Sequence, residues 1–331
     1  MYILKQATFA VIGVAAMLFI SKIDYRFWKK FYKIAYIASI ILLLMVLIPG
    51  IGRSAGGARR WINLGIQFQP SELAKIGLII FYASYLTDHK DELKDFKKGF
   101  VKPLLYLIPV VLILILVQDH LSATIIIVLV VGIMMLMAGV RPKYFATVGT
   151  GVAVAGAAGL YAMAKFTSKG AFRIARITSF LNPWADKQGD GWQVIQSLYA
   201  IGSGGLFGVG LGQSKQKYLY ISEPHTDFIF AVLAEELGFV GCAIVIGLFG
   251  IFIWRGVLAA MKAPDMFGSL VAVGITSLIG LQAIINIAVV TSSMPVTGMP
   301  LPFFSYGVTS LLILLCSVGV LLNISRAGTK V

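Results

Sequence analysis

Residues 103–140 read PLLYLIPVVLILILVQDHLSATIIIVLVVGIMMLMAGV, and this stretch decides the fold. Two apolar runs, 103–118 and 121–140, are separated only by the polar turn Asp119-His120. A bilayer core about 30 Å thick needs about 20 apolar residues per helix. The stretch therefore predicts two membrane helices joined by a tight turn. It does not have the short alternating segments of a membrane barrel.

The composition of the whole chain agrees with this stretch. Of the 331 residues, 58% are hydrophobic and 13% are charged, whereas soluble domains have about 45–50% and about 25%. Further apolar runs predict an all-α, polytopic transmembrane helix bundle of about nine spans, forming a single domain over residues 1–331. These runs are 7–21, 34–50, 72–87, 144–164, 228–254, 268–290 and 306–324.

The formal net charge of +14 raises the question of nucleic acid as a partner. We exclude nucleic acid, because the basic residues lie in loops between apolar runs rather than on one soluble face. Cys242 and Cys316 both lie in apolar runs, and their spacing suits neither a zinc site nor a disulfide framework.

The positions of Lys and Arg predict the orientation in the membrane. Short basic loops favour the cytoplasm, whereas long loops are largely exempt from this rule. Five segments on one side hold 16 of the 28 basic residues, namely 22–33, 88–102, 141–143, 255–265 and 325–331. The sequence thus predicts a cytoplasmic-membrane protein with a cytoplasmic C-terminus and a large extracellular loop at 165–227.

The same rule places Met1 outside, directly before the first span. The sequence SKIDYR at 21–26 has the flank of a stop-transfer helix rather than a cleavage site. We therefore expect a retained first helix, and a further helix upstream would explain the external start.

Ionisable side chains at membrane depth are costly, so each is a candidate for a site. The first outer segment, 56–75, reads GGARRWINLGIQFQPSELAK. Its Arg59 and Arg60 suit phosphate recognition, or they anchor the chain to lipid headgroups. Glu72 and Lys75 lie three residues apart on one helical face and predict an ion pair.

The long loop mixes aromatic and glycine residues. Residues 190–200 predict a short interfacial helix. The stretch GSGGLFGVGLG at 202–212 has no strand before it, so it fits neither nucleotide-binding fingerprint.

The sequence Glu223-Pro224-His225-Thr226-Asp227 comes directly before the run at 228. Asp227 is either a helix cap stabilised by the helix dipole or a general base at the outer mouth of the bundle. The general-base hypothesis needs basic groups nearby that hold phosphate, and Lys215 and Lys217 are candidates.

The last outer segment, 291–311, reads TSSMPVTGMPLPFFSYGVTSL. Its prolines and glycines predict a structured re-entrant turn. Non-helical backbone at this depth is tolerated where it is buried in protein or lines a cavity. Asn286, Thr297 and Ser305 are candidates for lining such a cavity, and helix packing is the alternative for Asn286.

Together these blocks resemble the SEDS family (RodA/FtsW/SpoVE) over essentially the whole chain. The blocks are GARRWINLG, QPSELAK, QSLYAIGSGGLFGVGLGQSKQKY, SEPHTDFIFAVLAEELGFVG and PVTGMPLPFFSYG. The resemblance leans towards the division and sporulation branch. It implies a bundle of usually ten spans that polymerises lipid II into glycan on the outer face of the membrane. The implied partners are a class B penicillin-binding protein and other division or elongation membrane proteins.

The resemblance also implies roles for single residues. Asp227 matches the family's proposed catalytic aspartate, and Glu72, Lys75 and Gln196 match further motif positions. Phosphate or substrate contacts are expected from these and from Arg59, Arg60, Lys215, Lys217, Glu223, His225 and Ser305, with a divalent cation, Mg²⁺ or Mn²⁺, as a candidate cofactor. The chain departs from the family's Pro-Asp-Leu-Gly motif at Asp119-His120.

Two functions of other classes compete with the enzyme. A lipid II flippase or transporter would have broken helices and polar groups at mid-membrane depth, and a division scaffold would need no catalytic residue. Polar residues cluster near the predicted outer ends of the spans, and few charges lie in mid-span, which favours the enzyme.

Overall fold

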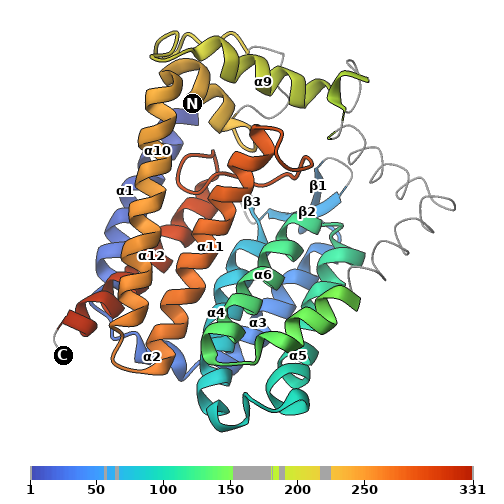
Figure 1. The fold of residues 1–331 in the computed structure, drawn as a ribbon, viewed down its shortest axis with the longest axis vertical. Coiled ribbons are helices and arrows are strands. Elements are labelled where there is room, and N and C mark those ends of the chain that lie inside the picture. The colour runs from blue at the N-terminus through green and yellow to red at the C-terminus, as the bar shows by residue number, and fades with distance from the viewer. Residues whose placement is uncertain are drawn as a thin grey trace, which may run out of the picture. The chain divides into compact units, whose positions relative to one another are not determined.

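The structure is a computed structural model that describes residues 2–55, 58–63, 67–151, 180, 182–185, 191–216 and 225–329. Helices dominate these residues, which confirms the predicted all-α fold (Figure 1). The chain divides into two compact units, each built from separate stretches. The first comprises Met1–Arg141, Ile251–Leu281 and Gly307–Val331, and the second comprises Pro142–Gly250 and Gln282–Tyr306.

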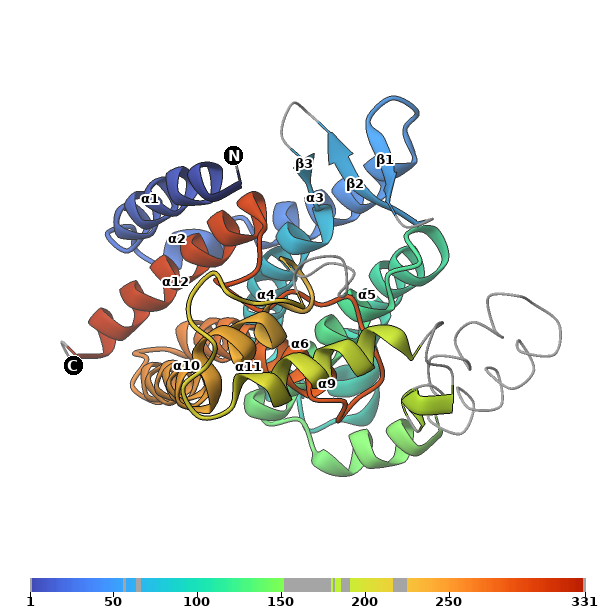
Figure 2. The ribbon, with the colours of Figure 1, turned by 90° about the horizontal axis from the view of Figure 1, so that it is seen from above.

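The first unit is a bundle in which α1 packs against α12 and α3 packs against α4 (Figure 2). Small residues permit close approach, since a Cβ on Gly13 would overlap Leu315 and one on Gly77 would overlap Ser39. The α-helices of this unit are α1 (Tyr2–Ile20), α2 (Arg26–Lys29), α3 (Tyr32–Leu44), α4 (Pro70–Asp88), α5 (Lys102–Leu112), α6 (Leu121–Ala138) and α12 (Val308–Thr329). Short 3₁₀ or π-helical turns lie at Met45–Leu47, Lys90–Glu92, Phe96–Val101 and Ile113–Val117.

The second unit contains α9 (Trp192–Gly204) and a 3₁₀ turn at Pro183–Ala185. The helices α10 (Ile229–Met261) and α11 (Met266–Val290) contribute residues to both units. An irregular loop, 291–307, leads from α11 to α12. The short helix predicted at 190–200 and the non-helical segment predicted after 290 are both confirmed.

Eight of the nine predicted spans coincide with described helices, with shifted ends. The run predicted at 228–254 continues to Met261, and the last one continues to Thr329. For the span 144–164 the structure describes residues only as far as 151, and these are helical from 142. By length and composition, five described helices suffice to cross a membrane: Phe96–Val117, Leu121–Ala138, Ile229–Met261, Met266–Val290 and Val308–Thr329.

A small antiparallel sheet, which was not predicted from the sequence, follows α3. Its strands are β1 (Gly52–Ala55), β2 (Ala58–Asn63) and β3 (Gln67–Phe68), in the order β1-β2-β3. Ile62 pairs with Phe68 and is buried. The first outer segment therefore contains paired strands, and Arg59 and Arg60, for which phosphate recognition and headgroup anchoring were the alternatives, lie on the central strand β2.

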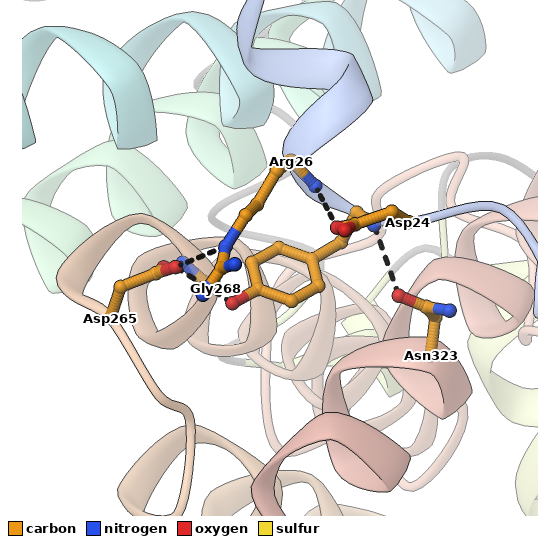
Figure 3. Close-up of polar contacts among 6 residues, drawn as sticks. Asp24, Arg26, Asp265, Gly268 and Asn323 are labelled. Carbon is orange, nitrogen blue, oxygen red and sulfur yellow. Dashed lines mark hydrogen bonds and ion pairs between the residues drawn. The ribbon is translucent and has the colours of Figure 1, made fainter.

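A polar joint connects the turn before α2 to α11 and α12 within the first unit (Figure 3). Asp265 caps α11 by accepting a hydrogen bond from Gly268 N at 2.7 Å. Its other oxygen accepts from Tyr25 Oη at 2.7 Å and Arg26 Nε at 2.9 Å. The main chain of Tyr25 in turn donates to Asn323 Oδ1 at 3.0 Å. One carboxylate thus gathers three donors at the start of a predicted membrane helix.

Candidate active site

Asp227 lies in the turn 225–228, which leads directly into α10. Phe228 is buried, Asp227 is half-buried and His225 is exposed. The predictions for Lys217 and Glu223 fall outside the described residues. The Asp227 carboxylate, expected to act as the base, is therefore placed near the N-terminus of the apolar helix α10, and its neighbour Phe228 is buried.

The buried Asn286 on α11 braces this turn. Its Nδ2 donates to the carbonyl oxygen of Asp227 at 2.7 Å and to that of Met299 at 2.6 Å. Asn286 is only 1% exposed, so both bonds lie in a medium of low dielectric, where they are strong. One amide group therefore fixes the Asp227 main chain to the loop 291–307.

Ser305 and Tyr306 brace the same turn from that loop. The Ser305 hydroxyl donates to Thr226 O at 2.5 Å and accepts from Leu301 N at 2.7 Å. Tyr306 N donates to His225 O at 2.8 Å. Carbonyls of three consecutive residues are thus held by donors from α11 and the loop. Ser305, expected to contact substrate, uses its hydroxyl in these main-chain bonds.

The loop also approaches the Asp227 side chain itself. A Cβ on Gly298 would lie 3.1 Å from Asp227 Oδ2, so the glycine leaves room for the carboxylate. Two buried oxygens, Asn286 Oδ1 and Thr297 Oγ1, have no hydrogen-bond partner among the described residues. Buried acceptors in this state are suited to a donor from water or a ligand. These oxygens fit the hypothesis that Asn286 and Thr297 line a cavity, and the bonds from Asn286 Nδ2 fit the alternative of a packing role, so both stay predictions.

A buried carboxylate on α10, that of Glu235, was not predicted from the sequence. Glu235 is 2% exposed and accepts from Ser214 Oγ at 2.5 Å, Lys215 N at 3.0 Å and Gln216 N at 3.3 Å. The Lys215 side chain, a predicted phosphate ligand, is exposed. The signal for Glu235 was present, because an acidic residue just inside an apolar helix requires partners.

Helix α9 places Gln196 in a buried position, 6% exposed. The next residue, Ser197, donates from its hydroxyl to Val290 O at 2.7 Å, at the end of α11. This bond attaches α9 to the segment that leads into the loop 291–307. Gln196, expected from the resemblance to contact substrate, therefore lies on a helix fixed to the same unit as Asp227.

In the first unit, Glu72 and Lys75 form the predicted ion pair on α4. The Lys75 Nζ–Glu72 Oε1 distance is 2.7 Å, and both side chains are buried. A buried pair is costly to desolvate, and removing either partner leaves an uncompensated charge. Each residue of this pair therefore depends on the other.

The two arginines of the hairpin have different environments. Arg59 is exposed. Arg60 donates from Nε to Gln118 O at 3.2 Å and from its terminal nitrogen to Asp119 O. Asp119 has a φ of +49°, which is uncommon for a residue with a side chain. Arg60 thus supports the turn between the two runs that decide the fold, whereas the Arg59 side chain is exposed.

The same turn contains a buried histidine. His120 Nδ1 accepts from Ala123 N at 3.2 Å, and its Nε2 lies 2.8 Å from the Gln69 amide. Burial, with the positive charges of Arg60 and Lys75, lowers the pKa of His120 to about 3. The structure places Gln69 Nε2 at this atom, but a neutral ring that accepts at Nδ1 carries its proton on Nε2, so we assign the Gln69 amide in the flipped orientation, with its carbonyl oxygen as the acceptor. His120 is a structural cap and not a proton donor at neutral pH.

Within the described residues, no group of three or more His, Cys, Asp or Glu side chains is arranged to hold a metal ion. The main-chain carbonyls of the Asp227 turn accept hydrogen bonds from the Asn286 amide, the Ser305 hydroxyl and the Tyr306 main-chain N–H. These hydrogen bonds can hold the Asp227 main chain in a fixed position near the N-terminus of α10. A carboxylate so placed can accept a proton from a hydroxyl group.

The sequence profile of the FtsW/RodA/SpoVE family, described as "Cell cycle protein", matches residues 1–330. Stage V sporulation protein E of Bacillus subtilis (strain 168) is 47% identical over 323 residues, 97% of this chain and 86% of that protein. The "probable peptidoglycan glycosyltransferase FtsW" of Geobacter sp. (strain M18) is 44% identical over 325 residues, 98% of this chain and 86% of that protein. Both names belong to the branch towards which the sequence leans.

Solved structures give the same result. A chain from a peptidoglycan synthase complex that coordinates polymerization and crosslinking has a TM-score of 0.83 at 29% identity, covering 100% of this chain and 91% of that one. The rod shape determining protein RodA of Thermus thermophilus has a TM-score of 0.68 at 30% identity, covering 97% and 86%. The apolar helices and these matches make the protein a multi-pass membrane protein. The chain therefore belongs to the FtsW/RodA/SpoVE family, which is the SEDS family that its motifs resemble.

Proposed function

We infer that this protein is a peptidoglycan glycosyltransferase that polymerises lipid II into glycan strands. Membership of the family and the activity named for its Geobacter relative support this function. The observation that carries the proposal is the bracing of the Asp227 turn by Asn286, Ser305 and Tyr306. A general base must be held within reach of the proton that it accepts, and this bracing fixes its main chain.

The proposed step is a single displacement. A sugar hydroxyl of the acceptor attacks the anomeric carbon of the donor and forms the new glycosidic bond. Asp227 accepts the hydroxyl proton as the bond from the anomeric carbon to the lipid pyrophosphate breaks. The electron pair of that bond leaves with the pyrophosphate, and the configuration at the carbon inverts.

The departing pyrophosphate needs positive charge. Arg59 and Lys215 are exposed and are proposed as phosphate contacts, whereas Arg60 and Lys75 already bind Asp119 O and Glu72. We expect Arg59→Ala to lower lipid II use with little effect on melting temperature, and Arg60→Ala to lower the melting temperature. Equal activity and stability in the two variants would argue for headgroup anchors instead.

A divalent cation, Mg²⁺ or Mn²⁺, stays a proposal. The described residues offer Asp227 without further clustered acidic ligands, so no step is assigned to a cation. Titration of polymerisation with a chelator and then with Mg²⁺ or Mn²⁺ tests the requirement.

A class B penicillin-binding protein is the proposed partner, because a structural relative belongs to a complex of polymerization and crosslinking. Other division or elongation membrane proteins are further candidates. The proposed location is the cytoplasmic membrane, with the C-terminus cytoplasmic and residues 88–102 on the same side. Labelling of an introduced Lys94→Cys in intact cells by an impermeant reagent would contradict this orientation.

The decisive experiment is polymerisation of labelled lipid II by the purified protein with its partner. Wild type is expected to make glycan strands, and Asp227→Ala is expected to make none while binding the partner normally. A flippase would move lipid II across vesicle membranes without joining it. A scaffold would do neither, so the three functions give different results.

A further inference from the structure

The glycine-rich loop that follows α9, residues 205–212, contacts α10 where that helix is interrupted. Gly238, with φ +65°, interrupts α10. On either side of it, Val209 N and Gly210 N donate to Glu235 O and Glu236 O at 3.0 and 3.1 Å. In the other direction, Phe239 N and Val240 N donate to Gly205 O and Leu206 O at 2.9 and 3.1 Å. Figure 1 shows the loop beside the first turns of α10.

The glycines are required by this close approach of two main chains. A Cβ on Gly208 would overlap Glu236 O, and one on Gly238 would overlap Gly208 N and Leu206 O. The contact therefore satisfies main-chain groups of a non-helical segment through the neighbouring helix. This is the condition under which irregular backbone can lie at membrane depth.

The side chains of this loop point away from the protein and are apolar. Four of them, Leu206, Phe207, Val209 and Leu211, are between 44% and 81% exposed, and the neighbouring Phe239 and Val240 on α10 are 67% and 43% exposed. The sequence has no charged residue from 198 to 214. Such a patch on a soluble surface would mark an interaction site or an aggregation risk.

The patch continues into the lipid-facing surface of α10. Residues 237–254 form a charge-free run bounded by Glu236 and Arg255, and at 1.5 Å per residue the run spans about 27 Å, close to a bilayer core. The exposed Ile244 and Leu248 lie on it. The loop pairs with residues 235–240, so its apolar side chains lie at the first turn of the span.

We propose that residues 205–212 are immersed in the bilayer, where Phe207 and Leu211 contact lipid acyl chains. Part of the segment predicted as the extracellular loop 165–227 is then a membrane-embedded hairpin at the Asp227 end of α10. The embedded segment is followed in the sequence by polar residues, which mark its boundary with water. There the buried Glu235 accepts hydrogen bonds from Ser214 Oγ and Lys215 N. Lipid is the occupant because the patch is continuous with the surface of a membrane-spanning helix.

Spin labels at single cysteines test this proposal. In a Cys242→Ala, Cys316→Ala background, labels are placed with Phe207→Cys and, separately, Leu211→Cys. The protein is studied alone in nanodiscs of phosphatidylethanolamine and phosphatidylglycerol. Collision rates with oxygen, which concentrates in lipid, are compared with those of a water-soluble nickel chelate. Leu248→Cys is the lipid reference, and Lys97→Cys, an exposed site near the end of another span, is the water reference.

The expected ratio of oxygen to nickel collisions at 207 and 211 matches that at 248 and is several-fold above that at 97. A ratio like that at 97 would place the loop in water and overturn the proposal. Loss of nickel collisions only after a penicillin-binding protein is added would identify a protein-binding surface instead, and would also overturn it. The two labelled sites are independent, so one poorly folded variant still leaves a result.

Discussion

Two aspartates, each just before a long apolar helix, show opposite uses of a carboxylate. Asp265 directly precedes α11, and its own oxygens accept from Gly268 N, Tyr25 Oη and Arg26 Nε (Figure 3). One residue, Phe228, separates Asp227 from α10. The hydrogen bonds that fix the turn of Asp227 are accepted by its main-chain carbonyls. At Asp265 the side chain itself binds three donors, whereas the turn of Asp227 is held through its main-chain carbonyls.

This difference separates two roles of an acidic residue near a membrane, a structural one at Asp265 and a catalytic one proposed for Asp227. Burial by itself would raise the pKa of Asp265, but the hydrogen bonds from Gly268, Tyr25 and Arg26 lower it below the ordinary value. A carboxylate so stabilised in its charged form is a weak base. A catalytic base must instead be able to take a proton in the step that it catalyses.

The largest expected effect comes from removing the negative charge of Asp227. Asp227→Asn keeps the size and most of the capping ability of the side chain and removes its basicity. We expect a loss of about 10²–10⁴-fold in glycan synthesis, the typical contribution of a general base, with normal insertion and partner binding. Lipid II polymerisation and a thermal melt measure the two properties.

Asp265→Asn is the matched control, and it is expected to polymerise at nearly the wild-type rate per folded molecule. The comparison would collapse if Asp227→Asn made glycan within a few-fold of wild type. Asp227 would then be a cap like Asp265. The next acidic candidate would be Glu223, four residues earlier.

Asp265→Asn should instead lower the free energy of unfolding by about 1–2 kcal/mol. The reason is that Tyr25 and Arg26 would then donate to a neutral amide oxygen instead of a charged carboxylate. The pKa of Asp265 is lowered from 3.8 in the folded protein, so its charged form adds stability above that pH. This contribution is lost as the pH falls through the lowered value. The gap in melting temperature between wild type and variant should therefore be constant from pH 7 to about 5 and shrink below about 4. A constant gap throughout would mean that the charge contributes nothing.

Among the described residues, eight of the nine runs predicted as spans coincide with helices, in the predicted order, because a bilayer requires long apolar runs. The hairpin at 52–68 did not, since two glycines and two arginines beside Trp61 also suit a loop at a membrane surface. Its strands form because Ile62 is buried and pairs with Phe68. Such pairing depends on tertiary contacts that the local pattern does not contain.

The site was predicted unevenly for the same reason. Asp227, Glu72 and Lys75 carry charges in costly places, so the sequence marks them. The role of Asn286 was left open between cavity lining and packing, and its bonds to Asp227 O and Met299 O depend on residues distant in sequence. Arg60 was expected on phosphate, but its contacts with Gln118 O and Asp119 O could not be read from its own segment.

A smaller change sharpens the Asp227 side of the comparison. Gly298→Ala would put a Cβ 3.1 Å from Asp227 Oδ2, a contact closer than most. The carboxylate should shift by a few tenths of an ångström, and we expect about a tenfold loss of turnover, since small misplacements of catalytic groups are costly. Gly247→Ala on α10 is the control, because its Cβ would meet nothing within 4 Å. Equal turnover in both variants would show that the position of the carboxylate is not critical.

The smallest effects distinguish the donors at Asp265. Tyr25 is 2% exposed, and burial together with Asp265 raises its pKa to about 12, so its hydroxyl stays a donor at all working pH values. Tyr25→Phe removes one bond to a charged acceptor and should cost about 1 kcal/mol. The Arg26 side chain is 59% exposed, and exposed ion pairs contribute little because water and salt screen them. Arg26→Ala should therefore leave the melting temperature within error at physiological salt. A larger loss from Arg26→Ala than from Tyr25→Phe would mean that the guanidinium, rather than the buried hydroxyl, keeps Asp265 charged and holds the joint together.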